Sequence, residues 1–215
     1  MPKITSLPPM TDPDGNDPSP IVDDNVGITK KITLTQLRTW LQTLVGWIST
    51  AMLADASITN AKVAAGAAVQ YVYTNPSAAS TGTTVIPLDD TIPQNTEGFE
   101  VMTLTITPRS ATNILVIEAT AFMGNANATQ YLTVALFQDS IANALAAENM
   151  MQSTAAGTVT IPLTHPRVSG TVSPITFKIR VGSHQVTTTT FNGSGGSRQF
   201  GTTPKSSLTI TEYKA

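Results

Sequence analysis

Residues 99–107, FEVMTLTIT, and residues 112–122, TNILVIEATAF, decide the fold class of this chain. In the first run Met102, Leu104 and Ile106 alternate with Val101 and three threonines. Successive side chains of an extended strand point to opposite faces, so this alternation predicts a strand with one buried face. Threonine suits the solvent-facing positions because a β-branched residue packs well on a pleated surface.

Further runs of this kind fill the chain from residue 69 to the C-terminus. The expected strands are 69–73, 83–87, 99–107, 112–122, 130–137, 157–164, 174–182, 187–191 and 206–213. Turn-forming Gly, Asn, Pro and Ser residues separate them. Residues 141–150, IANALAAENM, fit either a helix or a strand with a loop. The sequence therefore predicts a mainly β body at 69–215, an antiparallel β-sandwich and most simply a jelly roll.

Residues 33–54, TLTQLRTWLQTLVGWISTAMLA, have the one unbroken helical period in the chain. Thr33 and Gln36 form a capping box at its start. Apolar residues recur at spacings of three and four, at Leu34, Leu37, Leu41, Leu44, Ile48 and Ala51. This heptad seam, with leucine at its first position, predicts a short trimeric coiled coil. A helix packed on its own β-domain is the alternative.

Residues 1–32 are rich in proline and aspartate, which predicts an extended arm rather than a helix or a central strand. A disordered tail is the alternative. Within the arm, IVDD and GITKKITL suggest a short strand pair. Trp40 and Trp47 share one side of the helix. Apolar residues in the arm and the two tryptophans are the expected docking residues, Ile4, Leu7, Ile21, Val22, Trp40 and Trp47. Residues 55–68 are expected to form a linker or an intertwined shaft.

Several segments resemble proteins of tailed bacteriophages. Residues 7–41, LPPMTDPDGNDPSPIVDDNVGITKKITLTQLRTWL, resemble the N-terminal region of fibre and head-fibre proteins, and SITNAKVAAGAAV at 57–69 resembles fibre shafts. Segments of the body resemble phage knob domains at 86–98, 107–113, 135–147 and 188–198. The resemblance implies a homotrimer on the virion surface, made in the host cytoplasm, with residues 1–54 docked on capsid or tail proteins.

Composition excludes several other classes of protein. Charged residues make up 12% of the chain and the net charge is −2, so a basic footprint for nucleic acid is missing. There is no cysteine, and hence no disulfide framework. Arg38 and Gln42 interrupt the most apolar stretch, so membrane insertion is not expected.

No catalytic motif and no cofactor site stand out, so a non-enzymatic protein is expected. His165, expected in a loop, and His184 lack metal-ligand spacing. Asp89, Asp90 and Glu97 lie near one another in a loop and could support hydrolysis as paired carboxylates, and a solvated turn is the simpler interpretation. A glycine-rich loop is the candidate ligand contact, at Asn192, Gly193, Ser194, Gly195 and Gly196.

These observations favour a short trimeric phage fibre or spike whose knob contacts a host-surface glycan or protein. Two alternatives share the trimer: a capsid cement or decoration protein without receptor binding, and a non-viral jelly-roll lectin. A small β-sandwich hydrolase is the third alternative.

Overall fold

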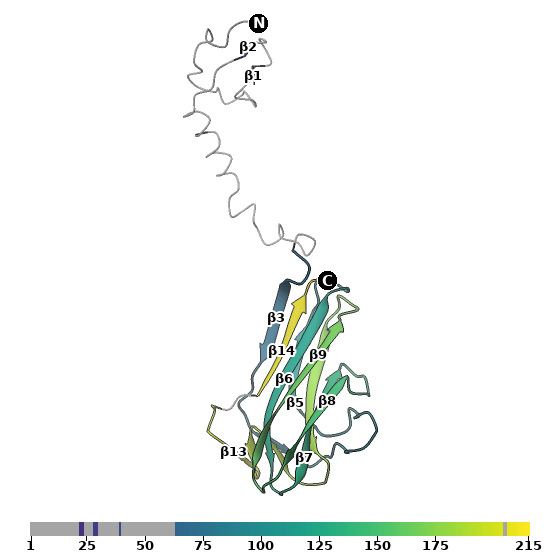
Figure 1. Cartoon of the computed structure of the whole chain (residues 1–215), viewed down its shortest axis with the longest axis vertical. Helices are drawn as coiled ribbons and strands as arrows, with labels where there is room; N and C mark the ends of the chain where they lie inside the picture. The colour runs from purple at the N-terminus through teal and green to yellow at the C-terminus, as the bar shows by residue number, and fades with distance from the viewer. Residues whose placement is uncertain (1–21, 24–27, 30–38, 40–62, 204–205) are drawn as a thin grey trace. The chain divides into compact units, whose positions relative to one another are not determined.

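The computed structural model describes residues 22–23, 28–29, 39, 63–203 and 206–215 (Figure 1). The chain divides into two units, Met1–Thr59 and Asn60–Ala215. In the first unit β1 (Val22–Asp23) pairs antiparallel with β2 (Ile28–Thr29), which confirms the expected strand pair.

Most of the N-terminal predictions fall outside the described residues. This holds for the heptad seam and for the docking residues Ile4, Leu7, Ile21, Trp40 and Trp47, whose roles stay predictions. Thr39 is the one described residue within 33–54, and it is helical and exposed.

The second unit is the body of the protein, and its strands account for most of its residues. They are β3 (Ala68–Thr74), β4 (Ser80–Gly82), β5 (Phe99–Ile106), β6 (Ile114–Asn125), β7 (Gln130–Gln138), β8 (Ala146–Gln152), β9 (Thr158–Val168), β10 (Ile175–Ser183), β11 (Thr189–Phe191), β12 (Gly193–Ser194), β13 (Ser197–Arg198) and β14 (Ser207–Tyr213).

These strands form two main sheets, and every pairing in them is antiparallel. In the first sheet β14 lies between β3 and β6, and β9 pairs with the other side of β6. The short strands β11 and β4 continue this sheet beside the far end of β6. The second sheet has the order β5-β10-β7-β8. The mainly β, antiparallel body expected from the sequence is confirmed.

The connections between the sheets follow a double Greek key. When the eight long strands are numbered along the chain, the first sheet has the order 1-8-3-6 and the second has the order 2-7-4-5. Such exchange of strands between two four-stranded sheets is the arrangement of a jelly roll. The two termini of the body therefore meet on neighbouring strands, β3 and β14 (Figure 1).

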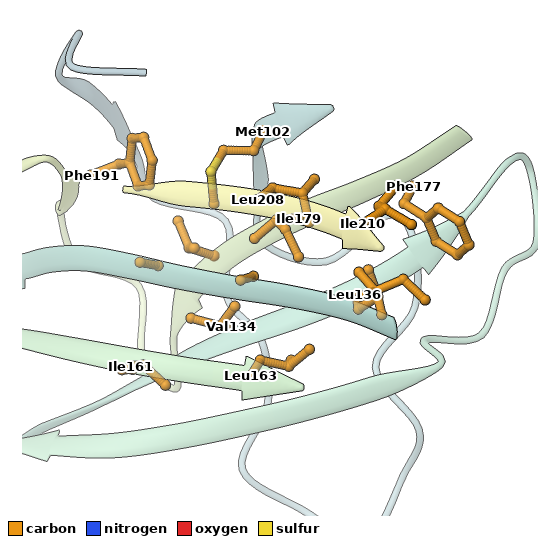
Figure 2. Close-up of a cluster of buried hydrophobic side chains, with 14 of the residues drawn as sticks. Met102, Val134, Leu136, Ile161, Leu163, Phe177, Ile179, Phe191, Leu208 and Ile210 are labelled. Atoms are coloured by element: carbon orange, nitrogen blue, oxygen red, sulfur yellow. The ribbon is translucent and has the colours of Figure 1, made fainter. Parts of the chain in front are cut away.

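A single hydrophobic core lies between the sheets (Figure 2). Leu208 and Ile210 of β14 are fully buried, as the alternation in the sequence predicts, and Phe177 and Ile179 of β10 approach them from the other sheet. Burying an aromatic or large aliphatic side chain contributes about 1.5–3 kcal/mol each.

Residues 83–98 form an irregular excursion, so the strand expected at 83–87 is wrong. The excursion crosses the outer face of the second sheet, where Ile86 packs on Ala135 and Phe137. The Arg180 guanidinium holds it there, because Nε donates to Glu97 O at 2.7 Å and Nη2 to Gly98 O at 2.8 Å. Ile86 is apolar and buried without being in a strand, since its partners lie on the outside of the sheet.

Two further expectations change. Within 141–150 the chain forms a loop followed by the start of β8, which decides between the two interpretations left open by the sequence. His165 lies in β9 and not in a loop. The adjacent Pro166, like Pro162, sits in this strand because β9 is a sheet edge, where a residue without an N–H is tolerated.

Candidate functional surfaces

The predicted ligand loop is a tight β-hairpin at one end of the body. Gly193 and Ser194 of β12 pair with Arg198 and Ser197 of β13. Gly195 and Gly196 turn the chain with φ of +58° and +83°, which suits a type I′ turn. Of the five candidate residues only these two glycines are exposed. The remaining three are buried, and their contacts are internal.

Asn192 anchors this hairpin to two distant segments. It is fully buried, and its Nδ2 donates to the carbonyls of Pro76 and Ala78 at 2.9 and 3.0 Å. Its Oδ1 accepts hydrogen bonds from Ser206 N at 3.3 Å and Ser206 Oγ at 2.7 Å. The φ of Asn192 is +54°, a conformation that asparagine tolerates better than most residues.

A second polar cluster ties the neighbouring loops together. Gln152, which is 2% exposed, accepts from Asn125 N and donates to the carbonyls of Asn125, Asn127 and Thr154. Thr187 Oγ1 donates to Asn125 Oδ1 at 3.0 Å. The loops after β6, β8 and β10 are therefore cross-linked by buried amides.

The hairpin itself is packed closely against the end of β6. Ser194 Oγ donates to Gly157 O at 2.9 Å. A Cβ added at Gly124 would lie 2.3 Å from Gly157 O and 2.6 Å from Ser194 Oγ, so only glycine fits this contact. We call the hairpin and the loops bound to it the rigid tip: residues 125–130, 152–157, 184–189 and 192–198.

Sequence reasoning found the hairpin from its glycines but missed Asn192 as its anchor, along with Asn125 and Gln152. Gly124–Asn125 and Asn192–Gly193 carry a turn signal, and that signal was visible. What the sequence does not show is the partner of each amide, because the partners come from strands far away in the chain.

The end of the body where residues 63–67 enter has its own buried anchor. The fully buried Glu212 carboxylate accepts from Arg109 N at 2.8 Å and from Asn113 Nδ2 at 2.7 Å. Gln70 donates to its second oxygen at 2.9 Å when the amide is oriented to satisfy its neighbours. Glu212 thereby fixes the turn between β5 and β6 to β14 and β3.

The paired carboxylates of the hydrolase alternative stabilise turns of the excursion. Asp89 Oδ1 accepts from Thr91 Oγ1 at 2.5 Å and from Thr91 N at 2.9 Å, and these hydrogen bonds lower the pKa of Asp89. Glu97 Oε2 accepts from Gln94 N at 2.9 Å. Asp89 and Asp90 border an open groove of about 410 Å³ between residues 89–93 and residues 144–147 of the β8 region. Glu97 does not line it.

The two histidines lie apart and have separate partners. Burial and the positive charge of Arg167 lower the pKa of His165. His184 Nδ1 accepts a hydrogen bond from Tyr131 N at 3.2 Å, and the two rings meet edge to face. In the described part of the chain no group of three or more His, Cys, Asp or Glu residues could hold a metal ion. Among these same residues no helix is long and apolar enough to cross a membrane.

No protein-family model and no curated protein matches the sequence. Among solved structures, the chain is similar to dimeric latent PorU from Porphyromonas gingivalis, with 8% identity, a TM-score of 0.34, and coverage of 70% of this chain and 14% of that one. For the structure of the infectious bursal disease virus Gx strain, the identity is 11% and the TM-score is 0.31. The match covers 68% of this chain and 37% of that one. For the enzymatically active domain of bacteriophage CBA120 tailspike protein 4, the identity is 16% and the TM-score is 0.24. The match covers 57% of this chain and 18% of that one.

This chain spans less than two-fifths of the length of each of these three proteins. At such identities and TM-scores the likenesses support no argument about function. The protein is thus characterised by its own geometry, an antiparallel β body with a buried-amide tip at one end and a buried carboxylate anchor at the other.

Proposed function

We propose that this chain is a non-enzymatic structural protein of a tailed-phage virion, a homotrimeric short fibre or spike. Residues 1–54 dock on the capsid or the tail, residues 33–54 trimerise, and residues 69–215 form the exposed body. The observation that carries the proposal is that phage-like segments follow one another along the chain. They lie at 7–41, at 57–69 and at four places in the body.

The rigid tip supports a role in surface contact. Its loops are held by buried hydrogen bonds from Asn192 and Gln152, so little conformational entropy remains to be lost when a partner binds. Three copies in a closed assembly present three such tips, and multivalency lets weak individual contacts hold a large partner. A host-surface glycan or protein is the proposed partner.

The homotrimer is tested by light scattering on the full chain at micromolar concentration. The expected mass is about three times the 22.6 kDa of one chain, and a monomer contradicts the proposal. Peptide mass spectrometry of purified particles should detect the chain in the virion. Its absence from particles that contain their other structural proteins contradicts a virion role.

The helix is tested separately by replacing Leu37, Leu41 and Leu44 with glutamine. If these residues form a trimeric seam, the assembly loosens while the body keeps its thermal transition. If the body unfolds as well, the helix packs on its own β-domain instead.

Two measurements separate the alternatives. A decoration protein without receptor binding is present in particles, but the purified trimer does not bind host cells. For the hydrolase, alanine at Asp89, Asp90 and Glu97 should abolish a measured hydrolysis of host glycans, and a wild-type chain without such activity excludes that alternative.

A further inference from the structure

The two sheets of the body differ in what covers their outer faces. The excursion at 83–98 lies over the second sheet, where Gly182 is so close to Ile86 that a Cβ there would be 2.9 Å from its Cγ1. The outer face of the β3-β14-β6-β9 sheet has no comparable cover from the described residues. Phe200 approaches it at the end near the tip, with its ring centroid 6.4 Å from that of Phe122.

This uncovered face carries several large apolar side chains. Side chains opposite the buried positions of the four strands form it, and strand register brings Tyr71, Thr211, Val116 and Pro166 into one row. We call it the tyrosine face and define it by six of its apolar side chains, Tyr71, Tyr73, Tyr213, Ile114, Val116 and Val168.

Several of the large side chains of the tyrosine face are exposed to solvent. Tyr71 is 58% exposed, Tyr73 is 62% exposed, and their rings stack on each other with centroids 5.8 Å apart. Val168 is 57% exposed at the far edge of the sheet. Contiguous apolar surface of this kind on a soluble protein marks a site of interaction.

The distribution of charge indicates which kind of partner packs against the tyrosine face. Along the outward positions of β3, β14, β6 and β9, Glu118 is the one charged side chain, and six positions are threonines, Thr120, Thr158, Thr160, Thr164, Thr209 and Thr211. A face with a single carboxylate can approach an identical face with little like-charge repulsion, which is confined to Glu118. A basic partner would find only Glu118 as a complementary charge there, and an acidic partner would find none. The second sheet differs, since Lys178, Arg180 and Glu100 project from its outer side.

The size of the tyrosine face also fits contact between copies. Four strands at a spacing of about 4.8 Å and about 30 Å of strand length give roughly 600 Å² in projection. Accessible area exceeds projected area because side chains stand out of the plane. A stable interface buries about 800 Å² of accessible surface per partner, so a contact of standard size fits this face.

We infer that the tyrosine face is the surface through which the bodies of neighbouring copies pack against each other. The inference rests on the proposed homotrimer and specifies how its bodies are oriented. The first sheet faces the three-fold axis, and the second sheet, with its excursion, faces outward. The groove beside Asp89 and the charged side chains of β10 then lie on the outer surface of the assembly.

Spin labels on the full chain test this orientation. The chain has no cysteine, so Thr211→Cys and Thr176→Cys each introduce a single labelling site. The two threonines are matched, because both are half-buried on an interior strand, β14 or β10, and face away from the core. They belong to different sheets, and the Oγ1 of Thr176 also shares a hydrogen bond with Thr105 Oγ1 at 2.9 Å.

The expected result follows from symmetry. In a three-fold assembly the distance between equivalent labels is √3 times their distance from the axis. The sheets are about 10 Å apart, so the distance between labels at 211 should be about 17 Å shorter than that between labels at 176. Electron–electron dipolar spectroscopy measures both distances, and light scattering reports the mass of each labelled protein.

Each outcome decides the question. Shorter distances at 211 support the inference, and so does dissociation of the assembly by a label at 211 when a label at 176 leaves it intact. Equal or longer distances at 211 in an intact trimer overturn the inference and leave the proposed trimer standing. If the unlabelled chain is a monomer, the proposed function and the inference both fail.

Discussion

Replacement of Asn192 by alanine tests whether this residue anchors the hairpin or contacts a ligand. The variant loses two hydrogen bonds to the carbonyls of Pro76 and Ala78 and two from the backbone and hydroxyl of Ser206. Each buried hydrogen bond contributes about 1 kcal/mol, and part of the loss is recovered where water reaches the freed carbonyls. We expect a loss of about 3 kcal/mol in the free energy of unfolding.

Urea unfolding measures this loss. The protein concentration is held fixed, because the apparent stability of the proposed trimer would depend on it. The corresponding shift in melting temperature is about 6–12 °C for a domain of this size. Asn127→Ala is the matched control. Asn127 is an exposed asparagine of the rigid tip whose described hydrogen bonds come from its backbone, so it should change stability by less than about 0.5 kcal/mol.

A third variant isolates the backbone conformation. Asn192→Gly loses the same hydrogen bonds but adopts a φ of +54° without strain, so it should be about 1 kcal/mol more stable than Asn192→Ala. The reasoning is refuted if Asn192→Ala unfolds like the wild-type protein while losing contact with host cells. That result would mean that Asn192 contacts a ligand and that the loop keeps its structure without the side chain of Asn192.

Three other predictions concern single residues elsewhere in the body. Gly124→Ala places a Cβ 2.3 Å from a backbone oxygen and should lower the free energy of unfolding by about 1–3 kcal/mol, measured by thermal unfolding. In the control Gly170→Ala the Cβ meets nothing within 4 Å, so only the strain of its positive φ should lower the stability. Equal losses of stability in the two variants contradict the close contact at Gly124. Glu212→Leu removes the carboxylate that accepts hydrogen bonds from Arg109 N and Asn113 Nδ2, and should cost about 3 kcal/mol in the free energy of unfolding. Glu212→Gln should cost less, and equal stability of the leucine variant and the wild type contradicts the role of Glu212 as an anchor. The folded-state pKa of His165 is lowered, so the unfolded chain takes up the proton first and stability falls as pH drops from about 6.5 towards the folded pKa; His165→Gln should reduce this slope in urea unfolding, and an unchanged slope contradicts it.

The sequence predicted the strands with two-residue alternation well, because alternation reports a buried face directly. β5, β10 and β14 begin or end within two residues of the expected positions. The failure at 83–87 has a physical cause. Ile86 is buried against the outside of a sheet, and a run of Val, Ile and Pro does not distinguish that environment from a strand in the core.

The limits at β8 and β9 have different causes. β8 is mostly exposed and contains alanine, glutamate and methionine, so its composition favours a helix, and only its pairing with β7 makes it a strand. Pro166 shortened the expected strand at β9, since proline ends most strands, yet an edge strand tolerates it. Local sequence does not say which strand is at an edge.

The candidate loop was predicted as a turn but not as a buried structure. Its glycines indicate a tight turn from their conformational freedom alone. The burial of Asn192 depends on Pro76, Ala78 and Ser206, which lie far away in sequence. Hydrogen bonds of this range are a property of the jelly-roll topology and leave no local pattern.

Immunogold labelling of intact phage particles in the electron microscope tests the central claim most directly. Antibodies raised against the exposed turn at Gly195 and Gly196 should label the outer surface of the particles at discrete positions on the head or the tail. Particles from a phage that lacks the gene are the control. Absence of label on wild-type particles whose purified chain binds the same antibody would contradict a virion structural role.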